Sequence, residues 1–113
     1  MKTWIAAALL TACLAAPAAA GTMEAAHANT ITSTDASGAT LRWHFNADNS
    51  YHMAAPDGSH VAGRWALEGG QLCMVPQGGE RACVPFEANK GVGDTWVAQT
   101  ANGPVTVSIV AGR

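Results

Sequence analysis

The stretch that decides the fold is WHFNADNSYHM, residues 43–53, because its turn chemistry sets the register of the strands on both sides. A three-residue loop at 47–49 suits a type I turn followed by Asn49 in the left-handed conformation. This loop length places Phe45 opposite Tyr51 and His44 opposite His52. A slip of one residue would exchange the two faces of the hairpin, so the turn also predicts which side chains face the core.

Similar turn signals recur along the chain at 35–38 (DASG), 56–58 (PDG), 69–70 (GG), 77–79 (QGG) and 102–103 (NG). Short runs rich in Val, Thr and aromatic residues separate them, which is typical of an antiparallel all-β domain. The sequence therefore predicts an up-and-down meander of about eight short strands, which forms a small barrel or a curled two-sheet sandwich.

The predicted registers gather large apolar side chains on one face of the sheet. Its core aromatics are Trp43, Phe45, Tyr51, Trp65, Phe86 and Trp96. Its aliphatic and sulfur-containing members are Leu41, Met53, Val61, Leu67, Leu72, Met74, Val84, Val107 and Ile109. Because so many bulky residues share so short a chain, we expect them to fill the interior as a hydrophobic core. A barrel whose aromatic interior holds a small apolar ligand is the alternative.

Three histidines fall on the opposite face: His44, His52 and His60. His44 and His52 are predicted cross-strand neighbours, and His60 lies diagonal to His52. We expect a solvated polar strip, since no carboxylate is placed beside the pair to orient a ligand. A Zn²⁺ or Cu²⁺ site is the alternative, because imidazole suits both metals; otherwise no cofactor is expected.

Two cysteines, Cys73 and Cys83, occur in the predicted β-domain. The 77–79 turn makes them direct cross-strand partners at a non-hydrogen-bonded pair, where opposed residues come closest. We expect a disulfide on the outward face, since paired cysteines are typical of exported proteins and a zinc site would need more ligands.

The first twenty residues have the composition of a signal peptide, with Lys2, an apolar run and small residues at 18–20. Soluble export to the periplasm or beyond is therefore expected. Leu10-Thr11-Ala12-Cys13 also has the pattern of a bacterial lipobox, which would lipidate Cys13 and anchor the protein to a membrane. Residues 21–29 are predicted to be a flexible arm, and residues 30–113 a single β-domain.

Composition narrows the classes of function. The chain has a net charge of −2 and no basic patch, so nucleic acid is not an expected partner. No nucleophile elbow, P-loop or zinc-protease motif occurs, and the aspartates fall in turns, so the sequence predicts no enzyme. The expected function is a non-catalytic envelope protein that binds an unknown protein or small molecule, or that acts as a structural accessory. Besides the metal-binding module, a secreted enzyme inhibitor using the loops around Asp57, Gln77 and Asn102 is an alternative.

Several motifs resemble a group of small exported proteobacterial proteins with the pattern D-G-x-Y … G-x-W … L-C … C … G-D-x-W … V-S-I-x-x-G-R. The matching segments are 48–51, 63–65, 72–73, Cys83, 93–96 and 107–113. Asn49 stands where the pattern has Gly, and Asn also adopts the left-handed conformation. The resemblance implies a shared β-fold and export, and no activity. In architecture and size alone the chain also resembles periplasmic lysozyme inhibitors, whose serine-glycine recognition loop it lacks.

Overall fold

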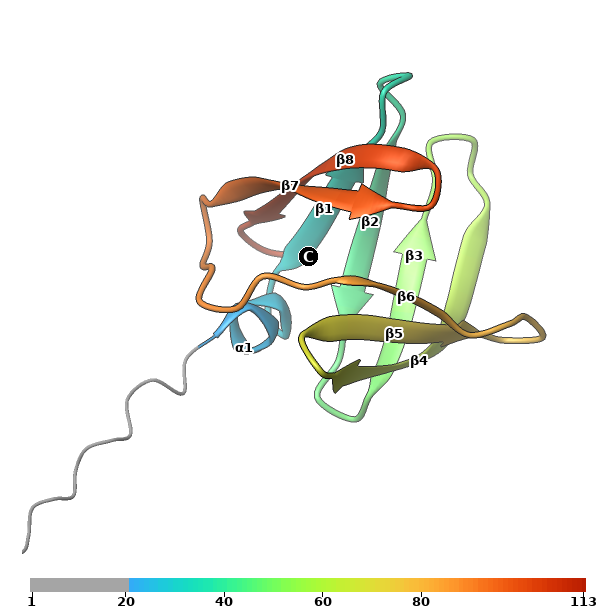
Figure 1. Ribbon diagram of the computed structural model, residues 1–113, viewed down its shortest axis with the longest axis horizontal. Helices are drawn as coiled ribbons and strands as arrows, with labels where there is room; N and C mark the ends of the chain where they lie inside the picture. Colours follow the sequence, from blue (N-terminus) through green and yellow to red (C-terminus); the bar gives the residue numbers. More distant parts are fainter. Residues whose placement is uncertain (1–20) are drawn as a thin grey trace, which may run out of the picture.

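The computed structural model describes residues 21–113, and the expected signal peptide and Cys13 lie outside them. One short helix precedes eight strands that form a single antiparallel, nearly closed barrel-like sheet (Figure 1). The elements are α1 (Thr22–Ala26), β1 (Thr30–Thr34), β2 (Thr40–Phe45), β3 (Ser50–Ala54), β4 (His60–Glu68), β5 (Gln71–Pro76), β6 (Ala82–Pro85), β7 (Thr95–Thr100) and β8 (Gly103–Val110). The predicted all-β meander is confirmed.

The strand order is β6-β5-β4-β3-β2-β1-β8-β7, so consecutive strands are neighbours except at one seam. The first and last strands of the chain are joined by the β1–β8 pairing. The sheet ends at β6 and β7, which contact each other without forming a ladder. In Figure 1 the β5–β6 pair and the β7–β8 pair face each other across the interior.

Turn chemistry accounts for the observed registers. Asn49 has a φ of 71°, the left-handed conformation that the type I turn requires, and Phe45 opposes Tyr51 as predicted. Glu68 pairs with Gln71 around the two glycines of the β4–β5 turn. The β7–β8 turn lies one residue earlier than predicted: Thr100 pairs with Gly103, so the loop is 101–102.

The predicted flexible arm is wrong, because α1 packs against the core. Met23 and Ala26 are buried, and the Thr22 hydroxyl donates to the Glu87 carbonyl and accepts from the Lys90 amide. A helix of five residues is not stable in isolation, so these tertiary contacts hold it in place. One pair of apolar residues is too short a period to reveal such a helix in the sequence.

The two ends of the barrel differ. Strands alternate in direction, so the turns β1–β2, β3–β4, β5–β6 and β7–β8 gather at one end, named here the turn end. The other end carries α1 and Arg113, whose guanidinium donates to the carbonyls of Ala26, Asn29 and Phe45 and to Asn46 Oδ1. This second end, named here the helix end, is therefore covered.

The apolar face predicted from the registers is largely confirmed as the core. Phe45 is 2% exposed, and Tyr51, Leu72 and Ile109 are also buried. Leu67 departs from the prediction, because it is 47% exposed. It is the penultimate residue of β4, beside the β4–β5 turn, and its cross-strand partner Leu72 is buried. Among residues 21–113, no helix is long and apolar enough to cross a membrane.

Candidate functional site

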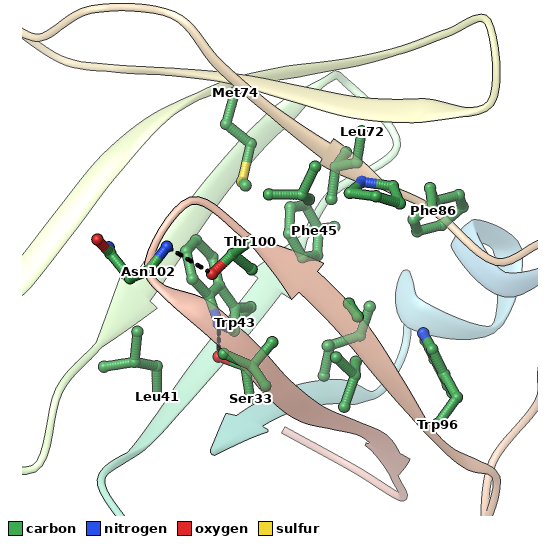
Figure 2. A pocket seen from close by; sticks show the side chains of 16 residues that line it. Ser33, Leu41, Trp43, Phe45, Leu72, Met74, Phe86, Trp96, Thr100 and Asn102 are labelled. Atoms are coloured by element: carbon green, nitrogen blue, oxygen red, sulfur yellow. Dashed lines mark hydrogen bonds between the residues drawn. The ribbon is translucent and has the colours of Figure 1, made fainter. Parts of the chain in front are cut away.

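An apolar cavity of about 270 Å³, partly open to solvent, lies beside the hydrophobic core, so the expectation that bulky side chains fill the interior holds only in part. It lies between the two pairs of strands that flank the β6–β7 seam, with β1 and β2 behind it (Figure 2). Its lining residues are almost all apolar, and they include four of the six predicted core aromatics: Trp43, Phe45, Phe86 and Trp96. Tyr51 and Trp65 belong to the solid part of the core.

Side-chain size explains why the cavity lies beside the seam. On β2 the inward positions are aromatic, and the Trp43 and Phe45 rings stack with centroids 5.9 Å apart. On β1 and β7 the inward positions shrink toward the turn end, to Ser33, Ala98 and Thr100. Small side chains at the wall of a barrel leave a space that the facing rings do not reach.

One hydrogen bond orients the largest ring in the cavity. Trp43 Nε1 donates to Ser33 Oγ at 2.9 Å, which fixes the indole against β1 (Figure 2). Thr100 Oγ1 donates to the Gly103 carbonyl, and the Asn102 amide donates to Thr100 Oγ1. Polar groups therefore concentrate where the cavity approaches the turn end. The sequence analysis missed Ser33 and Thr100, although a small polar residue at an inward strand position was the signal available.

A second, more polar cavity of about 370 Å³ adjoins the first at the turn end. The two share Ser33, Leu41, Thr100, Asn102 and Val105. The second is completed by residues of the exposed β1–β2 turn, including Asp35 and Ser37. Together the two cavities form a path from an apolar interior to a polar opening, and they are named here the inner cavity (about 270 Å³) and the mouth (about 370 Å³).

Asp35 is the single charged residue in the lining of these two cavities. Its Oδ1 accepts hydrogen bonds from Ser37 Oγ, the Ser37 amide and the Ala39 amide. The Ser37 hydroxyl and these backbone donors hold the pKa of the Asp35 carboxyl below its ordinary value, so the side chain is an anion at neutral pH.

The histidines lie on the outer face as predicted. His44 opposes His52, and the His52 and His60 rings stack with centroids 5.0 Å apart. His44 Nε2 is hydrogen-bonded to Thr30 Oγ1, and burial together with the charge of Arg113 lowers the pKa of His44. Within residues 21–113, no group of three or more His, Cys, Asp or Glu side chains is arranged to hold a metal ion.

The disulfide joins Cys73 and Cys83, whose Cα atoms are 4.0 Å apart. The two residues are direct cross-strand partners, as the turn at 77–79 predicts. They lie on the outward side of β5 and β6, as expected, although Cys73 is only 3% exposed.

The loops proposed as inhibitor contacts, around Asp57, Gln77 and Asn102, are exposed and all belong to the turn end. Of these three residues, Asn102 also lines the cavity. No protein-family model matches the chain, and no curated protein or solved structure matches it significantly.

Proposed function

We propose that this protein is an exported, non-catalytic binding protein of the cell envelope, periplasmic or secreted, that takes a small and mainly apolar molecule into its barrel. The observation that supports this most is the cavity of about 270 Å³ between the β6 and β7 sides of the sheet. An apolar cavity with a few polar groups at its edge is typical of small-molecule sites. The disulfide is consistent with an oxidising compartment outside the cytoplasm.

The volume limits the size of the ligand. An apolar cavity of about 150 Å³ holds one benzene molecule. By proportion, the cavity of about 270 Å³ has room for roughly ten non-hydrogen atoms of ligand, before any part of the molecule extends into the mouth. This is the size of a bicyclic aromatic molecule or of a medium-length alkyl chain.

The proposal is tested by fluorescence titration of the disulfide-bonded protein with 1-aminonaphthalene, a probe of this size whose emission moves to the blue in apolar surroundings. We expect saturable binding with one site per chain, competed by unlabelled apolar molecules of similar size. Absence of saturable binding would contradict the proposal.

Two neighbouring residues of β7 supply a matched pair of variants. Ala98 points into the cavity, whereas Val97 is 58% exposed on the outer face. Ala98→Phe fills part of the cavity and should weaken probe binding at least about tenfold, which is about 1.4 kcal/mol. Val97→Phe adds an aromatic ring to the same strand and should leave the affinity unchanged.

Folding of both variants is checked by circular dichroism. If Ala98→Phe does not fold, Leu41→Trp replaces it, because Leu41 is half-buried and lines both cavities, so that a larger side chain there would occupy cavity space. Equal probe affinity in the cavity variant and in Val97→Phe would place the probe on the outer surface and refute the proposal.

A further inference from the structure

The two adjoining cavities differ in the groups that line them. The inner cavity is walled by aromatic and aliphatic side chains, and its polar members lie on the side that it shares with the mouth. The mouth contains the exposed β1–β2 turn, where Asp35 and Ser37 lie. A ligand that follows this path meets apolar surface along its inner part and polar surface at its outer end.

Charge at the mouth has one sign. Asp35 lines the mouth, and neither cavity is lined by a lysine, arginine or histidine. Three donors of the β1–β2 turn, which are the Ser37 hydroxyl and the Ser37 and Ala39 amides, all donate hydrogen bonds to Asp35 Oδ1. These donors hold the carboxylate in place at the rim instead of neutralising it with a positive charge.

We propose, building on the function proposed above, that the ligand is a single-chain amphiphile whose alkyl chain of about ten carbons lies in the inner cavity and whose uncharged or cationic head group lies at the mouth beside Asp35. An anionic head group at this position faces a fixed carboxylate, and the residues that line the two cavities include no cation to offset it. The site therefore selects against fatty-acid anions in favour of neutral or positively charged amphiphiles of the same chain length.

The size of the selection follows from the exposure of Asp35. Two unit charges about 4 Å apart in water interact by an amount that corresponds to roughly a fivefold change in affinity. Because the mouth is open to solvent, the effect should decrease as salt is added, since the screening length falls from about 10 Å at 0.1 M to about 3 Å at 1 M.

The experiment measures displacement of bound 1-aminonaphthalene by 1-decanol, decanoate and decylammonium, which share a chain length and differ in head-group charge. In the wild-type protein, decanoate should be the weakest competitor. Asp35→Asn keeps the Oδ1 acceptor of the turn and removes the charge. We expect this variant to bind decanoate about fivefold more tightly and decylammonium about fivefold more weakly, with decanol unchanged.

Asp57→Asn is the matched control. Asp57 accepts the same pair of hydrogen bonds, from the Ser59 amide and hydroxyl, in the β3–β4 turn at the same end of the barrel. It lies outside both cavity linings, so its substitution should change none of the three affinities.

The outcomes separate the two proposals. If the probe binds but Asp35→Asn changes none of the competitors, or Asp57→Asn changes them equally, the head-group inference is refuted and the cavity proposal stands. If the probe binds and none of the three amphiphiles displaces it, the ligand is not a linear chain, and the inference also fails. If the probe does not bind at all, both proposals fail.

Discussion

Reduction of the Cys73–Cys83 disulfide should destabilise the barrel by a measurable amount. The bridge closes a loop with a sequence separation of ten residues. In the chain-entropy relation, a loop of about ten residues corresponds to about 2.7 kcal/mol of stabilisation at 25 °C. A domain of this size has a net stability of about 5–14 kcal/mol, so the bridge supplies a substantial part of it.

The corresponding change in melting temperature is about 10–20 °C, because 1 kcal/mol moves the midpoint by about 4–8 °C in a domain of this length. The assay is thermal unfolding followed by circular dichroism, with and without a phosphine reductant, and with thiol titration to prove complete reduction. A Cys73→Ala/Cys83→Ala double variant controls for effects of the reductant itself, and its midpoint should not respond.

The bridge also joins β5 to β6, a strand of four residues at the edge of the sheet. Reduced protein should therefore lose protection from hydrogen exchange first along β6. A fully reduced wild-type protein whose midpoint falls by less than about 3 °C would refute the reasoning, because the cross-link would then contribute little to the folded state.

Three further perturbations have expected outcomes. Arg113→Ala removes the donor to four acceptors around α1 and should lower stability by about 2 kcal/mol in urea unfolding. Arg81→Ala breaks only the exposed pair with Glu68 and should cost about 0.5 kcal/mol; equal costs would refute the stabilising role of the Arg113 hydrogen bonds. Gly63→Ala should lower the free energy of unfolding by about 1–3 kcal/mol or more, because a Cβ there would lie 2.3 Å from the Val75 carbonyl oxygen. Gly91→Ala is the control and should be nearly neutral, because a Cβ there meets no atom within 4 Å; similar melting temperatures for the two variants would contradict this. Serine hydroxyls and backbone donors lower the pKa of the turn residues Asp35, Asp48 and Asp57, so the stabilisation they give is complete above the ordinary pKa of about 4 and is lost as the pH falls through the lowered values. Between pH 6 and pH 2, the urea midpoint should therefore fall less in a Ser37→Ala/Ser50→Ala/Ser59→Ala variant than in the wild-type protein. Equal decreases in the two proteins would contradict the stabilising role of these hydrogen bonds.

Local turn chemistry made most of the fold predictable. In the hairpin at residues 43–53, the loop length and the left-handed Asn49 determine the pairing of Phe45 with Tyr51 without reference to the rest of the chain. The same reasoning placed Cys73 opposite Cys83. Registers of this kind depend on a few residues close in sequence, so one sequence contains the information for them.

Features that depend on closure of the sheet were not predictable in this way. Strand alternation assigns Leu67 to the inner face, but it does not say how much of this side chain the closed sheet covers. The helix α1 is held by Glu87, Lys90 and Arg113, which are distant in sequence. The cavity likewise results from small inward residues on β1 and β7 that meet only when the barrel forms.

The most direct test of the account is where a bound probe lies. Intermolecular nuclear Overhauser effects should connect the ring protons of 1-aminonaphthalene with the methyl groups of Leu72 and Val107, which line the cavity. No such effects should reach Val75 and Val97, whose side chains are exposed on the outer face. Contacts with the outer valines in place of the inner methyl groups would contradict the claim that the barrel interior is the binding site.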